Sequence, residues 1–426
     1  MSTRFISTGL AAALAGLAPG AVTAQGNGQS YAITNATIVP VVGARIDRGT
    51  VVIQGGKITA VGASVAVPAG AQRVDGTGLF VYPGLIDAGT RLGLTEIGSV
   101  PGSEDTQEIG PFNPHNEALT AVNPSSELIP VTRVSGLTTA ITSATGGSIQ
   151  GWAALIDLAG WTPDEMALKR KAAMVMTYPR VAGGRGRGGF RGQQPQGDPT
   201  EAMNRQVKEL TDYLRDARAY NELAVKPKTN LAFQALAPIF KGEAPVIFDV
   251  QTAGQIRGAI ALADTFKLKI IIRGGSEAWQ VAELLAQRKI PVIVGPTTET
   301  PGNDEPYDAI YANPGALAKA GVTIAFQTAD AAESRNLPYN AALATAYGLD
   351  PDEALRALTI NPARMFGVDD RIGSIEVGKD ATLQVTTGDP LDARTVVKHV
   401  FIRGQSIPMN DRHNRLYETY RARPKP

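Results

Sequence analysis

Both ends of the chain carry short apolar stretches that are separated by turn residues. These stretches are residues 31–39, 50–53, 57–61 and 72–74 near the amino terminus, and residues 371–375, 381–385 and 396–402 near the carboxyl terminus. Runs rich in β-branched residues and bounded by Gly, Pro and Asp are typical of antiparallel strands. Because neither end is long enough to enclose an ample core, we expect one small β-sandwich domain assembled from both ends of the chain.

The middle of the chain alternates apolar stretches with segments of helical character. The apolar stretches are residues 138–142, 246–250, 270–272, 292–294 and 322–326, and the helical segments are residues 255–266, 277–287 and 314–320. Short strands that are apolar on both faces and alternate with helices predict a parallel sheet covered on both sides. Their number between residues 81 and 370 favours an α/β fold with a (β/α)8 TIM-like barrel over a smaller doubly wound sheet.

Two helix starts share one local pattern. Asp198 and Asp350 are each followed directly by Pro, and then by Glu at the third position after the Asp. An Asp at the N-cap accepts a hydrogen bond from a free backbone N–H, Pro suits the first helical position, and Glu faces the positive end of the helix dipole. The pattern predicts helices that begin at Pro199 and Pro351.

The first 24 residues have the composition of a signal peptide. Arg4 precedes an uncharged stretch at residues 5–17, and Val22 and Ala24 place small residues ahead of a cleavage site. The apolar stretch is shorter than the ~20 residues that a membrane span requires, and no later segment has the length and apolar character of a span. We therefore expect a periplasmic or secreted protein with no membrane span.

These patterns divide the chain into successive parts. The parts are a signal peptide (1–24), the first part of the β domain (25–80), the barrel (81–370) with a Gly- and Arg-rich insertion (182–198), the second part of the β domain (371–408) and an Arg-rich tail (409–426). The insertion has the composition of some RNA-binding tracts. Its few arginines, in a chain predicted to be exported, favour a flexible surface loop, and we expect no nucleic acid partner.

Composition narrows the chemistry that the chain can carry. The formal net charge is +1, from 41 Lys and Arg against 40 Asp and Glu, which argues against a general polyanion binder. The chain contains no Cys, so disulfides, thiolate catalysis and iron–sulfur clusters are excluded. It contains 3 His, namely His115, His399 and His413.

Several motifs occur in the order expected of one enzyme family. They are GGKITAVG at residues 55–62, VYPGLIDAGTRLG at 81–93, NPARMFG at 361–367, RIGSIEVGKDA at 371–381 and GDPL at 388–391. Together they resemble the metal-dependent amidohydrolase superfamily, in its imidazolonepropionase-like branch, from about residue 31 to residue 408. The resemblance implies a barrel flanked by a β domain, and hydrolysis of amide or related C–N bonds by one or two divalent metals.

The same resemblance implies metal ligands that this sequence does not supply. The His-x-His pair after the first barrel strand is replaced by Gly89 and Arg91, and Gly274 is the nearest match to a later His. Glycine has no side chain, and a guanidinium has no free lone pair and carries a positive charge. His115 falls in a loop, while His399 and His413 fall in the β domain and the tail, so three or four imidazoles cannot be gathered. We expect no metal and no other cofactor.

Acidic and amide side chains occupy other positions at the expected barrel mouth. Asp249 and Gln251 follow a strand where a ligand His is implied, and Asp330 lies one residue beyond the implied position of the family's Asp. Asp249 and Asp330 are our candidate catalytic residues. An alternative is an all-oxygen site for Mg²⁺ or Ca²⁺ made by these two and Asp87, although we favour a bracing role for Asp87 in the first barrel strand.

Three residues are candidates for binding a substrate or ligand, namely Arg91, Gln251 and Gly274. A guanidinium at the barrel mouth suits a carboxylate ligand through paired hydrogen bonds. The alternative is that Arg91 forms an internal salt bridge with Asp249 or another acid, filling the space that the metal would take.

These observations lead to three functional hypotheses. The first is an exported, metal-free pseudoenzyme or non-catalytic subunit of the amidohydrolase family, acting as a homo-oligomer or beside an intact amidohydrolase paralogue. The second is an atypical hydrolase of non-peptide C–N bonds in an amide, lactam or cyclic amide. The third is a small-molecule binding protein that uses the barrel mouth.

Overall fold

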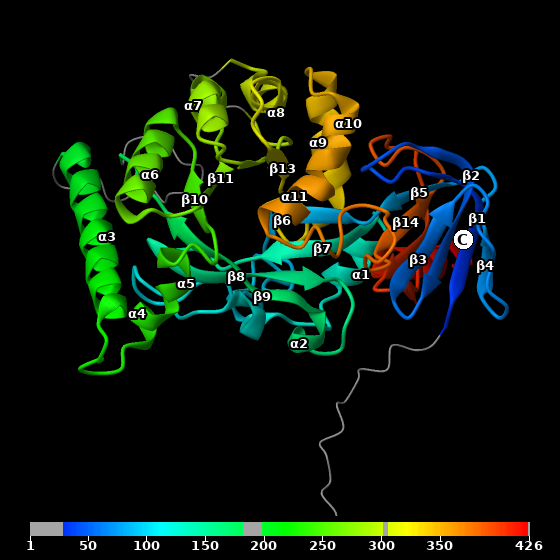
Figure 1. Cartoon of the computed structure of the whole chain (residues 1–426), viewed down its shortest axis with the longest axis horizontal. Helices are drawn as coiled ribbons and strands as arrows, with labels where there is room; N and C mark the ends of the chain where they lie inside the picture. Colours follow the sequence, from blue (N-terminus) through cyan, green and yellow to red (C-terminus); the bar gives the residue numbers. More distant parts are fainter. Residues whose placement is uncertain (1–28, 182–197, 301–305, 425–426) are drawn as a thin grey trace, which may run out of the picture.

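The protein is described by a computed structural model in which residues 29–181, 198–300 and 306–424 are placed. The predicted signal peptide (1–24) and residues 182–197 of the Gly- and Arg-rich insertion lie outside these described residues. The strands form two eight-stranded sheets, one of which nearly closes into a barrel. Figure 1 shows the barrel in the middle of the molecule, the other sheet on one side of it, and the long helix α3 (Pro199–Glu222) on the opposite side.

The barrel sheet has the order β13-β12-β11-β10-β9-β8-β7-β6. Its strands are β6 (Leu85–Thr90), β7 (Leu137–Thr142), β8 (Ile149–Asp157), β9 (Ala167–Thr177), β10 (Val246–Val250), β11 (Ile270–Gly274), β12 (Val292–Val294) and β13 (Ile324–Phe326). Strands β6 and β7 pair in parallel, as do β9 to β13. The predicted α/β barrel is therefore confirmed, and five of its strands lie on the apolar stretches of the sequence.

One strand departs from the predicted all-parallel pattern. Strand β8 is antiparallel to both of its neighbours, β7 and β9. The connection from β7 to β8 turns at Gly146 and Gly147, whose φ angles are +85° and +74°. So short a link between neighbouring strands suits an antiparallel pair, because a parallel pair needs a crossover of a dozen or more residues.

Helices cover the outer side of β10 to β13 (Figure 1). They are α6 (Ala253–Phe266), α7 (Ala282–Gln287), α8 (Ala309–Lys319), α9 (Leu337–Ala346) and α10 (Pro351–Ala357). Both predicted helix starts are confirmed, since Asp198 accepts a hydrogen bond from the Thr200 N–H at 2.8 Å and Asp350 from the Glu353 N–H at 3.1 Å. Helix α8 begins earlier than the predicted start at 314 and contains Pro314 in its interior.

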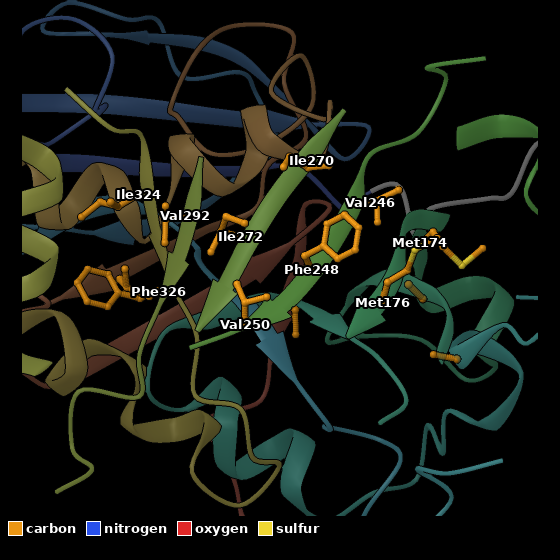
Figure 2. Packing of buried hydrophobic residues seen from close by; sticks show 14 of the residues in the cluster. Met174, Met176, Val246, Phe248, Val250, Ile270, Ile272, Val292, Ile324 and Phe326 are labelled. Carbon is orange, nitrogen blue, oxygen red and sulfur yellow. The ribbon is translucent and has the colours of Figure 1, made fainter. Parts of the chain in front are cut away.

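The barrel strands separate their side chains onto two faces. Phe248, Ile272 and Phe326 belong to the large cluster on the helix side of the sheet, which Figure 2 shows. Ile247 and Ile271 belong to a second cluster that takes residues from every strand of the barrel, which therefore fills its interior. Because side chains alternate along a strand, the residues two positions after this second pair also point into the barrel.

The second sheet is built from both ends of the chain and has the order β16-β15-β14-β5-β1-β2-β3, with β4 paired to β1. Its strands are β1 (Tyr31–Ile38), β2 (Ile46–Gln54), β3 (Lys57–Gly62), β4 (Gln72–Asp75), β5 (Phe80–Pro83), β14 (Leu383–Thr386), β15 (Val397–Ile402) and β16 (Gln405–Ile407). The rings of Tyr31 and Phe401 meet in its core with centroids 5.1 Å apart. The Ile58 N–H reaches the Lys379 carbonyl at 2.9 Å, so β3 curls back towards the segment before β14.

Two predictions about the end of the chain are resolved. The predicted strand at residues 371–375 is wrong, because this segment forms turns that pack against helix α11 (Ile360–Met365). Gly373 has a φ of +91°, and a Cβ there would lie 2.8 Å from the Cβ of Ala363. This turn therefore requires glycine, which has no Cβ and readily adopts a positive φ. The Arg-rich tail forms helix α12 (Arg412–Arg421). Of the helices in the described ranges, none has the length and apolar character to cross a membrane.

Candidate functional site

A buried ion pair occupies the carboxyl-terminal ends of two central barrel strands. Asp249 on β10 and Arg273 on β11 are direct neighbours in the parallel ladder, and both continue the face that points into the barrel. Arg273 donates from Nε and Nη2 to the two carboxylate oxygens of Asp249, at 2.5 and 2.8 Å. The side chain of Arg273 is 8% exposed and that of Asp249 is 27% exposed. The guanidinium and the carboxylate therefore form a bidentate salt bridge.

Neutral side chains complete the coordination of this pair. Arg273 donates from Nη1 to Oγ of Ser143 at 2.9 Å. Gln150 donates from Nε2 to Oδ2 of Asp249 at 3.1 Å and to Oγ1 of Thr177 at 2.8 Å. The carboxylate and the guanidinium thus use most of their hydrogen-bonding capacity inside the protein.

The space beside Gly89 is already filled. A Cβ built on Gly89 would lie 2.4 Å from Oε1 of Gln327 and 3.3 Å from Cδ of Arg273. Gln327 is held in place because its Nε2 donates to the Gly295 carbonyl at 2.9 Å. Any imidazole at position 89 would have to displace this amide.

A second ion pair lies nearer the solvent. Arg91 donates from Nη2 to Oδ2 of Asp330 at 2.6 Å, and their side chains are 31% and 39% exposed. Asp330 also accepts from the Ala332 N–H at 2.9 Å. Arg91 therefore forms an internal salt bridge, and its acid is Asp330, whereas Asp249 pairs with Arg273.

The other two predicted ligand-binding residues meet one another. Gly274 ends β11 with a φ of +91°, and a Cβ there would lie 2.3 Å from Nε2 of Gln251. Gln251 is exposed, and its carbonyl accepts from the Glu277 N–H at 3.0 Å. The structure thus distributes the five candidate residues over three separate pairs, one of which is completed by Arg273. Three cavities lie in the described part of the chain, and none of the five candidate residues lines any of these three.

Asp87 holds together the two end strands of the barrel sheet. Its Oδ1 accepts from the N–H groups of Gly89 and Thr328, at 3.1 and 3.2 Å, and its Oδ2 accepts from Oγ1 of Thr328 at 2.5 Å. These bonds join β6 to the residues after β13, where the two strands have no ladder between them. The side chain is fully buried, and this burial raises its pKa to about 7 although the hydrogen bonds lower it.

The residues present at this end of the barrel do not fit a divalent metal. Gly89 has no donor, and the guanidinium groups of Arg91 and Arg273 offer positive charge and no lone pair. Within the placed residues, no group of three or more His, Asp or Glu side chains could hold a metal ion. The histidines are dispersed, with His115 in an exposed loop, His399 on β15 and His413 on α12.

Arg273 and Gln327 were not among the residues predicted from sequence for this site. Arg273 directly precedes Gly274, the nearest sequence match to a ligand His, and it takes the interior position instead. One signal in the sequence could have identified it. Asp249 and Arg273 each come two positions after an isoleucine in an apolar stretch, Ile247 and Ile271, and side-chain alternation along two neighbouring strands then puts the opposite charges on one face.

Comparison with known proteins supports the architecture. Residues 308–407 match the family model described as "Amidohydrolase family". A search of curated proteins found no match to the chain. An amidohydrolase structure from Thermotoga maritima MSB8 is similar over 88% of this chain and 99% of its own, with 28% identity and a TM-score of 0.77.

More distant structures share the fold alone. A molinate hydrolase matches with 18% identity and a TM-score of 0.59, covering 90% of this chain and 95% of its own. An adenosine deaminase from Xanthomonas campestris with bound zinc matches with 19% identity and a TM-score of 0.52, covering 92% of this chain and 97% of its own. The family match over residues 308–407 and the Thermotoga structure agree with the barrel and its two-ended second sheet, so this chain resembles the amidohydrolase family in its fold and in the sequence of its carboxyl-terminal part.

Proposed function

We propose that this protein is a metal-free pseudoenzyme of the amidohydrolase family, acting as a non-catalytic subunit. The observation that carries the proposal is the Arg273–Asp249 ion pair, which with Gln327 fills the interior beside Gly89. A guanidinium here supplies the positive charge that balances Asp249, so the carboxylate has no need of a metal. Hydrolysis by the family's metal chemistry requires a divalent metal that acts as a Lewis acid and binds a hydroxide. The residues that fill this interior supply no free ligand for such a metal.

Metal analysis of the purified mature chain tests this proposal. The protein is incubated with Zn²⁺, Mn²⁺ or Fe²⁺, dialysed and analysed by mass spectrometry, with the zinc-containing Xanthomonas campestris adenosine deaminase treated in parallel as the positive control. We expect no stoichiometric metal in this protein, and no change in melting temperature on adding a chelator. One metal ion per chain would overturn the proposal.

Restoring the His-x-His pair gives a second, sharper test. The double variant Gly89→His with Arg91→His should still bind no zinc, because the Arg273 guanidinium keeps its positive charge beside position 89 and the later metal ligands are missing too. Adding Arg273→His removes the internal cation and serves as the comparison. Stoichiometric zinc or amide hydrolysis in the double variant alone would show that Arg273 does not exclude the metal.

We propose in addition that the chain is exported, on the strength of the n-region, apolar stretch and cleavage site in residues 1–24. The test is amino-terminal sequencing of the protein from a fractionated expression host. A mature chain beginning at Gln25 in the periplasm or medium supports export. A full-length chain confined to the cytoplasm contradicts it.

A further inference from the structure

A cavity of about 590 Å³ lies at the floor of the barrel, at the end opposite the ion pairs. Its walls include the residues that precede β10, β11 and β12, together with the last residues of α11. Phe366, which follows α11, also belongs to the cluster that fills the barrel interior, so this segment closes the barrel from below. The volume falls in the range of small-molecule sites, which is roughly 300 to 1,000 Å³.

The charges around this cavity are unbalanced. The basic side chains in its wall are Lys169, Lys269, Arg288, Lys289 and Arg364, and the acidic ones are Glu243 and Asp264. Arg288 is paired with Asp264. Arg364 lies 4.0 Å from a carboxylate oxygen of Asp369, which is outside the cavity wall. Positive charge therefore exceeds negative charge in the wall, as it does in sites that accept anions.

Two of the lysines are bonded to neutral groups. Lys169 donates from Nζ to the Phe366 carbonyl at 2.8 Å, and Lys269 donates to the Gly242 carbonyl at 2.6 Å. An ammonium has three donors, so each retains donors for a further acceptor. Lys169 is half-buried, and this burial lowers its pKa. Burial disfavours the charged form of Lys169, and an anion that entered the cavity would stabilise that charged form.

The remaining wall is apolar. Ile260, Ile290 and Met365 contribute side chains to it, and Ile260 and Ile290 are 6% and 8% exposed. A free inorganic anion would leave this surface unused, whereas a purely apolar molecule would leave the ammonium groups without a partner. The wall suits a ligand with an anionic group at one end and an apolar body at the other.

We propose that the floor cavity binds a small organic anion, with its carboxylate, phosphate or sulfonate group against Lys169 and Lys269 and its apolar body against Ile260, Ile290 and Met365. This site is at the opposite end of the barrel from the mouth and is independent of whether the mouth binds metal. Binding here would give a chain without metal chemistry a ligand-dependent role.

Three probes separate the contributions to binding. 8-Anilinonaphthalene-1-sulfonate carries both an anionic group and an apolar body, N-phenyl-1-naphthylamine carries the body alone, and inorganic phosphate carries the charge alone. Fluorescence titration of the mature chain should show one saturable site for the sulfonate. The neutral amine should bind at least tenfold more weakly, and phosphate should displace the sulfonate only at high concentration.

Variants locate the site. Lys169→Met and Lys269→Gln should each weaken sulfonate binding roughly tenfold, which corresponds to about 1.4 kcal/mol. Lys319→Met is the matched control, because Lys319 is an exposed lysine in the last turn of α8 and is outside the cavity wall. Its affinity should equal that of the wild type, and circular dichroism should show every variant folded.

Three results would overturn the proposal. They are absence of saturable sulfonate binding, unchanged affinity in both cavity variants, or an equal loss in Lys319→Met. Because the side chain of Lys269 is exposed and donates to a backbone carbonyl, Lys269→Gln remains informative if Lys169→Met fails to fold.

Discussion

Basic side chains at the two ends of the barrel have different hydrogen-bond partners. At the mouth, Arg273 faces Asp249 and Arg91 faces Asp330, so each guanidinium has a carboxylate partner. At the floor, Lys169 and Lys269 face backbone carbonyls. In barrels of this class the mouth is where catalysis takes place and the floor contributes to stability. In this chain the two ion pairs lie where the catalytic site is expected, and the cavity with an excess of positive charge lies at the other end.

The difference separates two uses of a buried charge. A charge with a full set of internal partners holds neighbouring strands together and has little left to offer a ligand. A charge bonded only to carbonyls keeps its unused donors and its net positive field. We therefore expect mouth substitutions to change mainly the free energy of unfolding, and floor substitutions to change mainly ligand affinity.

The largest expected effect follows from breaking the buried pair at the mouth. Asp249→Ala leaves the Arg273 guanidinium buried without its counter-charge, which should lower the free energy of unfolding by about 3–5 kcal/mol. Urea denaturation followed by circular dichroism measures the change. The double variant Asp249→Leu with Arg273→Met removes both charges and should recover most of the loss. A decrease below about 1 kcal/mol in the single variant would contradict a structural role for the pair.

The buried Asp87, whose hydrogen bonds join β6 to the residues after β13, should make the free energy of unfolding depend on pH. Asp87 releases its proton near pH 3.8 in the unfolded chain and near pH 7 in the folded protein, because burial raises its pKa. Folding therefore takes up a proton between these values, so the contribution of Asp87 to stability falls as the pH rises, by up to ~1.4 kcal/mol per pH unit.

The variant Asp87→Asn isolates this contribution. It keeps an oxygen acceptor for the two backbone N–H groups and has no proton to release, so its unfolding free energy should fall less between pH 4 and pH 7. Denaturation curves of both proteins across this interval measure the difference. Parallel pH profiles would refute the assigned role of Asp87.

The outer ion pair at the mouth should matter much less than the inner one. Arg91 and Asp330 are both about one-third exposed, and exposed pairs contribute roughly 0–1 kcal/mol. Arg91→Met should therefore lower the unfolding free energy by no more than about 1 kcal/mol. A loss as large as that of Asp249→Ala would place the structural centre of the mouth at the outer pair.

The smallest stability effect is expected at the floor. Lys289→Gln removes an exposed charge from a wall that has an excess of positive charge, so the unfolding free energy should change by less than about 0.5 kcal/mol. The same denaturation assay measures it. A clear destabilisation would mean that the floor charges, like those of the mouth, have a structural role.

Much of the fold could be predicted because its signals are local. The apolar stretches, the two Asp-Pro helix starts and the strand-rich ends each report on a few neighbouring residues, and they correspond to real elements. The prediction failed at residues 371–375, where the apolar residues suggest a strand. There Gly373 takes a positive φ against α11, a contact with residues about ten positions earlier that no local pattern reveals.

For the candidate site, too, the sequence predicted what depends on residue type and missed what depends on tertiary contacts. The sequence determined which side chains could not ligate a metal, because the chemistry of Gly89 and of a guanidinium does not depend on the fold. It did not determine which acid meets which base. Arg91 could have paired with either acid, and only the parallel register of β10 with β11 placed Arg273 directly beside Asp249 and left Asp330 for Arg91.

What the sequence by itself determined, then, is the class of fold and the loss of the metal ligands, since both depend on residue type and local spacing. Only the tertiary structure decided that Asp249 and Asp330 at the mouth are paired with guanidinium groups while the cavity at the floor has an excess of basic side chains. Strand register and barrel closure bring together residues that are 24 positions apart at the mouth, in Asp249 and Arg273, and 197 apart at the floor, in Lys169 and Phe366. Charge balance in a folded protein is a property of such contacts, and composition alone reports only their sum.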